Sequence, residues 1–123
     1  MNIKIILQGS PPSTNHVYKI RSMGKFSKIY MTAEGKVIKA DYQRQVREQY
    51  KGDPLDCKIE LSVKLFFSTK HKRDIDNFSK VLLDSLTGIV WVDDSQIHVM
   101  HIEKHIEEAP RVELSINNIE SMI

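Results

Sequence analysis

The sequence predicts an α+β fold, in which two helices pack on a mixed, largely antiparallel β-sheet of about five or six strands. Apolar and polar residues alternate from Lys58 to Phe67, as in a strand with one buried face. Apolar residues recur every four positions from Ile38 to Tyr50, as on one face of a helix. The length of 123 residues favours a single domain over residues 1–123, with one modest core.

The chain before this helix predicts a strand, a loop and a loose hairpin. Apolar residues at alternate positions of the segment 3–7 indicate the first strand. Residues 9–15 are rich in Gly, Ser, Pro and Asn, and we expect them to form a loop. Short strands at residues 17–20 and 29–31 are expected to pair, joined by a basic and mobile segment at residues 21–28.

Capping signals bound the two helices. Thr32 is a suitable N-cap for the first helix, and Glu34 would interact favourably with its positive end. Gly52, followed by Pro54, ends this helix. Apolar side chains at helical spacing predict a second helix that begins near Phe78 and ends at Gly88.

The remainder of the chain completes the sheet. Residues 89–92 are expected to be extended and to lead into a turn at residues 93–96. Residues 97–106 predict a strand with imperfect alternation, and Val112, Leu114 and Ile116 alternate in the last strand. Trp91 follows an apolar residue and is expected in the core.

Composition narrows the function classes without selecting one. A net charge of +2 is too small to indicate nucleic-acid binding, so any such argument depends on local clusters of charge. No apolar run is long enough to span a bilayer. The single cysteine, Cys57, excludes an intramolecular disulfide and a paired-cysteine zinc site, and it suits a reducing cytoplasm.

The first candidate site residues are Asp74 and Asp76, which follow the central strand. In an extended segment, residues two apart point to the same side, so both carboxylates could reach one ion. Carboxylates are hard oxygen ligands suited to Mg²⁺ or Mn²⁺. The alternative is that either aspartate is simply the N-cap of the following helix.

A second carboxylate pair, Asp93–Asp94, follows the second helix. The fold would have to bring this pair to the first, and the alternative is an ordinary turn. Two pairs that flank one short helix beside a basic run favour a metal site at one edge of the sheet.

Basic residues directly precede the first pair. Lys70, Lys72 and Arg73 beside carboxylates suit a phosphate-rich partner, because Lys and Arg form charge-assisted hydrogen bonds with phosphate. The alternative is a loop that is merely solvated. His98, His101 and His105 share no clear period with a carboxylate, and we do not expect them to be zinc ligands.

Lys80 has two competing interpretations. Asp76, Lys80 and Asp84 are four residues apart, so they would line one face of a helix. Lys80 could form only a surface ladder of ion pairs, or it could bind a phosphate oxygen and offset charge in a transition state. Spacing does not distinguish these roles.

Several motifs together resemble the RusA family of Holliday-junction resolvases. The block from Arg73 to Lys80 reads Arg-Asp-Ile-Asp-Asn-Phe-x-Lys, and the block from Trp91 to Ile97 reads Trp-x-Asp-Asp-Ser-Gln-Ile. The segments 11–15 and 33–35 also resemble that family, so the match spans nearly the whole chain in order. His71 departs from it, because this run can be more uniformly Arg-rich in the family.

The resemblance implies a small homodimeric, Mg²⁺-dependent endonuclease that acts on branched DNA. By position, Asp74, Asp76 and Asp94 match the catalytic, metal-binding acids, and Lys80 matches an essential lysine. Arg73 and Asn77 match flanking positions that support DNA contact or site geometry.

The expected function is therefore resolution of four-way DNA junctions by paired nicks that leave 5′-phosphate ends, in recombination and repair. A flap or general structure-specific nuclease with the same residues is one alternative. A non-catalytic DNA-binding module with structural aspartates is another. Metal-dependent cleavage distinguishes the enzymes from the module.

Overall fold

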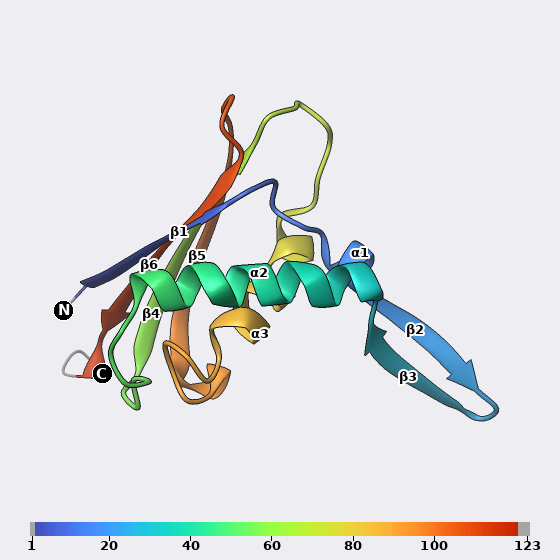
Figure 1. Ribbon diagram of the computed structural model, residues 1–123, viewed down its shortest axis with the longest axis horizontal. Helices are drawn as coiled ribbons and strands as arrows, with labels where there is room; N and C mark the ends of the chain where they lie inside the picture. Colours follow the sequence, from blue (N-terminus) through green and yellow to red (C-terminus); the bar gives the residue numbers. More distant parts are fainter. Residues whose placement is uncertain (1, 121–123) are drawn as a thin grey trace.

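A four-stranded sheet is the frame of the molecule, and the helices pack against it (Figure 1). The computed structural model describes residues 2–120. The strand order is β1-β6-β4-β5. β1 (Asn2–Gln8), β6 (Arg111–Asn118) and β4 (Ile59–Phe67) pair antiparallel, whereas β5 (Ile97–Ile106) runs parallel to β4. The predicted α+β class, with a mixed and largely antiparallel sheet, is confirmed.

The central strand β4 organises the core. Ile59, Leu61, Val63 and Leu65 are at most 1% exposed, because β4 has a neighbour on each side and helices over this face. Trp91 is completely buried in the same hydrophobic cluster, as predicted. Its indole Nε1 donates a hydrogen bond of 2.9 Å to Thr87 Oγ1, which satisfies the one polar group of this side chain.

Helix α2 (Ala33–Gln49) begins where the sequence predicts and ends three residues before the predicted stop at Gly52, with Tyr50 as its C-cap. The Thr32 side chain accepts a 2.9 Å hydrogen bond from the Gly35 amide, and Tyr42 and Val46 are buried. Two glutamines of the helix also bind the edge strand: Gln49 Oε1 accepts from Ile6 N at 2.8 Å, and Gln45 Oε1 accepts from Gln8 N at 2.7 Å. These side chains satisfy backbone groups that an edge strand leaves free.

The second predicted helix is divided in two. A 3₁₀ helix, η1 (Ile75–Phe78), precedes α3 (Lys80–Leu86), and Ser79 lies between them. Gly88 follows with φ +89°, as expected for a glycine that ends a helix. The predicted turn at residues 93–96 contains η2 (Asp94–Gln96).

The N-terminal segment differs most from the prediction. The expected loop at residues 9–15 already contains the start of α1 (Thr14–Val17), which Ser13 caps. The expected hairpin is longer than predicted: β2 (Tyr18–Met23) and β3 (Phe26–Met31) extend through residues 21–28. This hairpin is separate from the main sheet and projects from the body (Figure 1). Both of its faces are exposed, so it has no apolar alternation from which its full length could be predicted.

Within residues 2–120, no helix is both long and apolar enough to cross a membrane.

Candidate active site

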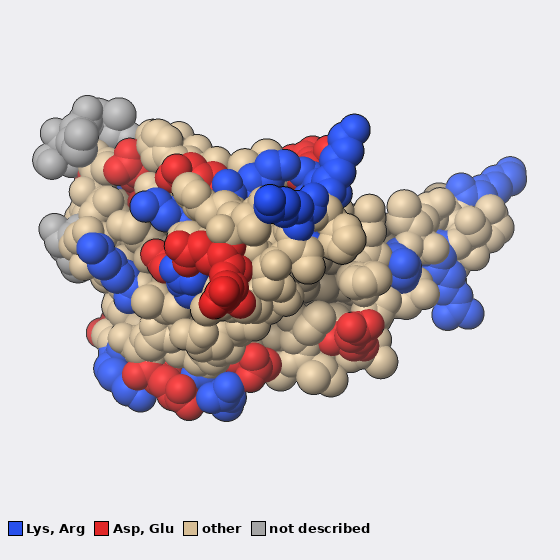
Figure 2. Space-filling view, turned by 90° about the horizontal axis from the view of Figure 1, so that it is seen from above, with Lys and Arg blue, Asp and Glu red and all other residues tan. Residues whose placement is uncertain are grey.

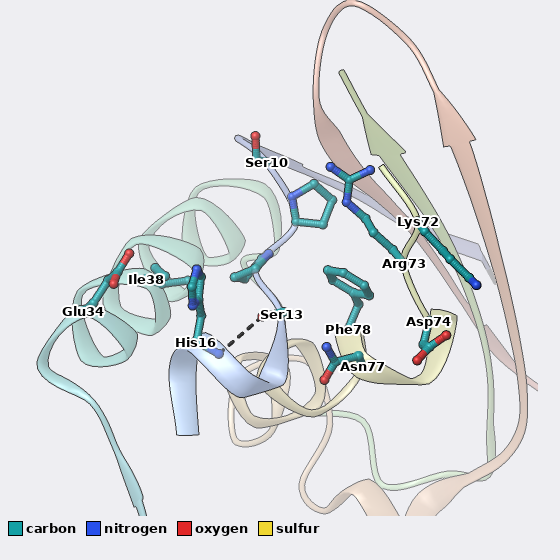
Figure 3. Close-up of a pocket in the computed structure, with 12 residues that line it drawn as sticks. Ser10, Ser13, His16, Glu34, Ile38, Lys72, Arg73, Asp74, Asn77 and Phe78 are labelled. Atoms are coloured by element: carbon teal, nitrogen blue, oxygen red, sulfur yellow. Dashed lines mark hydrogen bonds between the residues drawn. The ribbon is translucent and has the colours of Figure 1, made fainter. Parts of the chain in front are cut away.

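A pocket of about 570 Å³ opens beside the first predicted carboxylate (Figure 3). Its walls come from the segment after β1, from α1, from the first turns of α2, and from the segment that enters η1. The lining residues are Ser10, Pro11, Pro12, Ser13, His16, Glu34, Ile38, Lys72, Arg73, Asp74, Asn77 and Phe78. The structure therefore brings Lys72, Arg73, Asp74 and Asn77 together, as the sequence predicts.

The carboxylates of Asp74 and Asp76 are available for a ligand. Asp74 occupies the N-cap position of η1, but its side chain makes no capping hydrogen bond. The Asn77 amide instead donates to the Asp74 backbone carbonyl, at 3.2 Å. Asp74 and Asp76 are exposed, and neither side chain forms a hydrogen bond or ion pair with any of residues 2–120. Capping thus does not explain the Asp74 carboxylate.

Asp94 lies at the other end of the sheet from the basic run. The parallel register pairs Ile59 with Ile97 and Phe67 with Ile106. The turn with Asp94 therefore lies beside the start of β4, whereas the segment that contains Arg73 leaves the end of β4. Lys104, near the end of β5, donates a 2.5 Å hydrogen bond to the Arg73 carbonyl, which fixes this placement.

Within the single described chain, the two carboxylate pairs are not grouped at one edge of the sheet, so their joint site stays a prediction. Parallel pairing of β4 with β5 places the second pair at the opposite end from the basic run, and helical spacing could not reveal this. Among the residues that the structure describes, no three His, Cys, Asp or Glu side chains are grouped closely enough to hold a metal ion.

The two neighbouring aspartates of the second pair differ in role. Asp93 is the N-cap of η2: its Oδ1 accepts from the Ser95 amide at 3.4 Å, and the Gln96 side chain accepts from the Asp93 amide at 2.8 Å. The hydrogen bonds from Ser95 lower the pKa of Asp93, because they stabilise its charged form. Asp94 is exposed in the first turn and forms no ion pair within the described chain.

Arg73 is held in place by its own loop. Its guanidinium donates to the carbonyls of Thr69 and His71 at 3.0 and 3.1 Å and to Thr69 Oγ1 at 2.7 Å. It also lies 4.1 Å from the centroid of the Phe67 ring. Lys70 and Lys72, in contrast, are exposed and have no ion-pair partner among residues 2–120. The lysines are thus the freer cations of this run, and Arg73 shapes the loop that presents them.

Lys80 forms the predicted ion pair with Asp84 but none with Asp76, and Tyr18 joins this pair in a cluster. The Lys80 Nζ lies 3.6 Å from Asp84 Oδ2 and 4.8 Å from the centroid of the Tyr18 ring. The Tyr18 hydroxyl donates a short hydrogen bond to the same carboxylate. Partial burial, and then this hydrogen bond, raise the pKa of Tyr18 above its ordinary value. Tyr18 lies 66 positions before Asp84, so no local spacing could have connected them.

The sequence patterns did not predict two further residues of the pocket, His16 and Glu34, as site residues. His16 comes from α1, in a segment for which the patterns predict a loop or a strand, and Glu34 fits only the role of a helix-end residue. The signals in the sequence for this part of the pocket are the family-like segments 11–15 and 33–35.

The donors present are of the right type for a divalent cation. Mg²⁺ is usually bound through one or two carboxylates, and it keeps several waters or takes substrate phosphate oxygens for its other ligands. Asp74 and Asp76 are close in sequence, exposed and unpaired within the described residues, so they fit this requirement.

Comparisons with known proteins agree with the motifs. The family model described as Endodeoxyribonuclease RusA matches residues 9–117. The chain is 30% identical over 125 residues to the crossover junction endodeoxyribonuclease rusA of Enterobacteria phage 82, and 26% identical over 121 residues to crossover junction endodeoxyribonuclease RusA of Escherichia coli (strain K12). Each match covers 97% of this chain and 98% of the relative.

A protein of the same name from Aquifex aeolicus (strain VF5) is 38% identical over 66 residues, which is 52% of each chain, so that match spans about half of the relative. The family model includes the pocket residues from Ser10 onwards and all the predicted site residues from Lys70 to Asp94. By its motifs and by this match over most of its length, the chain belongs to the RusA family of endodeoxyribonucleases.

Proposed function

We propose that this protein is a divalent-metal-dependent endodeoxyribonuclease that resolves four-way DNA junctions by paired nicks. The observation that supports this most strongly is the family match over residues 9–117, which includes the pocket with Lys72, Arg73, Asp74 and Asn77. The relatives with 98% coverage bear the name crossover junction endodeoxyribonuclease.

In this proposal Asp74, Asp76 and Asp94 hold Mg²⁺, for which Mn²⁺ could substitute. The ion would supply Lewis-acid polarisation of the scissile phosphate. The support from the chain itself is that Asp74 and Asp76 are exposed and engaged in no capping bond or ion pair within residues 2–120. Asp94 is favoured over Asp93 because η2 already uses the Asp93 carboxylate as its cap. Since no three acidic side chains of residues 2–120 are grouped closely enough to hold one ion, the part of Asp94 in the site would come from a second subunit or from a rearrangement on DNA.

The basic and amide side chains have the task of positioning DNA. Lys70 and Lys72 would contact phosphates directly, and Arg73 would do so while it braces the loop. Asn77 lines the pocket and can donate to a phosphate oxygen. Lys80 would offset negative charge that develops in the transition state.

We propose that the protein is a homodimer, that each subunit is a single domain, and that it acts in the cytoplasm. One subunit offers one pocket with these residues, and paired nicks require two sites, which two-fold symmetry would supply. One hydrophobic cluster that joins sheet and helices supports a single domain, though residues 1 and 121–123 lie outside the described part. The unpaired Cys57 supports a reducing compartment.

The test is cleavage of end-labelled DNA with and without Mg²⁺, on a mobile four-way junction, a flap and a linear duplex of equal length. We expect symmetric nicks in the junction, loss of cutting in EDTA, and recovery with Mg²⁺ or Mn²⁺. Ca²⁺, with longer and looser coordination, should support binding without efficient cutting. Preferential cutting of the flap would favour the general structure-specific nuclease. Binding without cutting in any metal would indicate a DNA-binding module.

A further inference from the structure

The hairpin of β2 and β3 contributes little to the folded body. Its strands pair with each other, and its main contact with the rest of the protein is through α1 at its base. Every residue from Lys19 to Tyr30 is exposed, and the hairpin projects past the end of α2 (Figure 1). A two-stranded hairpin is marginally stable in water by itself, so its side chains do not form a core of their own.

The pairing register separates the hairpin into two faces. Lys19 pairs with Tyr30, and Arg21 pairs with Lys28. Cross-strand partners point to the same side, and side chains alternate along each strand. One side, which we call the basic face, therefore presents Lys19, Arg21, Met23, Phe26, Lys28 and Tyr30.

The hairpin has a net positive charge, whereas the rest of the chain does not. From Tyr18 to Met31 there are three lysines and one arginine, and there is no Asp or Glu. The whole chain has a net charge of only +2, so the remainder is net negative. None of the four cations forms an ion pair within the described residues, and Figure 2 shows Lys and Arg side chains along the projecting arm.

The tip of the hairpin is apolar. Met23 and Phe26 face each other across the turn and are 56% and 78% exposed. The two-residue turn begins with Gly24 at φ +62°, a conformation that glycine adopts without strain. An exposed ring between cations resembles the side chains that stack on unpaired bases or insert between base pairs.

We propose that the β2–β3 hairpin is a second DNA-binding arm. The basic face contacts phosphates of one arm of branched DNA, and the Met23–Phe26 tip contacts bases that are unstacked at the branch point. The inference rests on the proposed function, because a branch point belongs to that substrate. The arm is continuous with the pocket, since His16 of α1 lines the pocket and β2 begins two residues later.

Charge favours DNA over the hairpin of a second copy of this chain as the occupant. Two such hairpins brought together would place like charges against each other without an acidic residue between them, which is unfavourable. A DNA backbone supplies the opposite charge at regular spacing along the whole basic face.

The test compares a hairpin variant with a matched control. The hairpin variant is Lys19→Ala, Arg21→Ala and Lys28→Ala. The control is Lys4→Ala, Arg47→Ala and Lys51→Ala, which removes exposed and unpaired cations from β1, from α2 and from the segment just after α2. Affinity is measured against salt in EDTA, for a four-way junction and a linear duplex, and sedimentation gives the oligomeric state of each variant.

We expect the hairpin variant to flatten the slope of log affinity against log salt by up to about 2.7 units, since each of three phosphate contacts contributes about 0.9. The control should keep the wild-type slope. Phe26→Ala should lower junction affinity by about tenfold and leave duplex affinity unchanged, because it removes only base contacts. Binding of the wild type should raise the fluorescence of a 2-aminopurine placed at the branch point, because the base is unstacked there. Phe26→Ala should abolish this rise.

Failure of the arm and failure of the proposed function give different results. If the wild type cuts the junction and the hairpin variant binds and cuts identically, the arm is overturned and the proposed function stands. If the hairpin variant changes the oligomeric state with an unchanged salt slope, the hairpin is a self-association surface, and the proposal is wrong. If Phe26→Ala binds the junction with the wild-type affinity, the role of the tip is overturned. If the wild type neither prefers nor cuts junctions, the proposed function itself has failed.

Discussion

The acidic residues of the two carboxylate pairs and of α3 differ in the interactions that their carboxylates already make. Asp93 caps η2, and Asp84 accepts from Tyr18 and lies beside Lys80. Asp74 and Asp76 have no hydrogen-bond or ion-pair partner among residues 2–120. Substituting a carboxylate that has no partner in the fold should change the function of the protein without changing its stability.

Asp74→Asn and Asp76→Asn should each abolish cleavage and keep junction binding. Each change removes a negative ligand for the metal and hardly alters volume, and binding can tighten because a charge that repels phosphate is gone. Single-turnover cleavage and gel-shift assays measure the two effects. A folded variant that cuts at nearly the wild-type rate would show that the aspartate concerned is not a ligand.

Asp94→Asn should abolish cleavage, whereas Asp93→Asn should leave measurable activity. Adjacent side chains point in different directions, and the η2 cap already engages Asp93. Asp93→Asn keeps an oxygen that can cap, so the turn should persist. The reverse pattern in single-turnover assays would mean that Asp93 is the ligand.

Lys80→Ala tests whether Lys80 has a role in chemistry. If Lys80 only pairs with the partly exposed Asp84, the free energy of unfolding should fall by a few tenths of a kcal/mol and cleavage should persist. We expect instead a loss of cleavage of about 10²-fold or more, as for the loss of a group that stabilises transition-state charge. Tyr18→Phe is the matched control, because it removes the other partner of Asp84 and keeps the ring beside Lys80.

At the scale of elements, the loop after β4 is a structured support and not a flexible tail. Arg73 binds the carbonyls of Thr69 and His71 and covers the Phe67 ring, and Lys104 of β5 binds the Arg73 carbonyl. The loop is therefore held at both its start and its end. Its two exposed lysines can be altered while all of these interactions persist.

Replacing Lys70, Lys72 and Arg73 with Ala should weaken DNA binding and flatten its salt dependence, by somewhat less than one unit for each phosphate that these side chains bind. The structure adds a distinction between the three. Lys70→Ala with Lys72→Ala should change only the salt slope, whereas Arg73→Ala should also loosen the loop and increase its amide hydrogen exchange. An unchanged slope in the triple variant would show that the run is only solvated.

At the scale of the whole molecule, one described chain presents one pocket of this composition, and its second carboxylate pair lies at the opposite end of β4 and β5 from the basic run. A four-way junction has two strands to cut symmetrically. If the protein cuts both strands as proposed, two copies of this pocket are needed, and a two-fold symmetric dimer would supply them.

The protein should sediment as a homodimer, both alone and on a four-way junction. Mixing wild type with an excess of Asp74→Asn protein should then give junctions nicked in one strand only, since each mixed dimer has one intact site. A monomer with and without DNA would count against junction resolution and favour the flap nuclease.

Much of the fold was predictable because it depends on local patterns. The alternation in β4, the helical stripe and Thr32 cap of α2, and the burial of Trp91 all follow from residues within a few positions of one another. The composition of the basic and acidic block from Lys70 to Asp94 likewise indicated metal ligands and phosphate contacts before any geometry was known, and the resemblance of its motifs implied a nuclease.

Long-range pairing set how these pieces meet. The parallel pairing of β5 with β4 separates Asp94 from the basic run, and the contact between Tyr18 and Asp84 joins residues 66 positions apart. The hairpin lacks an apolar face, so periodicity could not reveal its length, and only its cross-strand register gathers its cations on one side. Residue type and short spacing are local properties, so the sequence indicates which residues could carry out the chemistry. Their placement depends on pairing between distant segments, which local spacing does not encode.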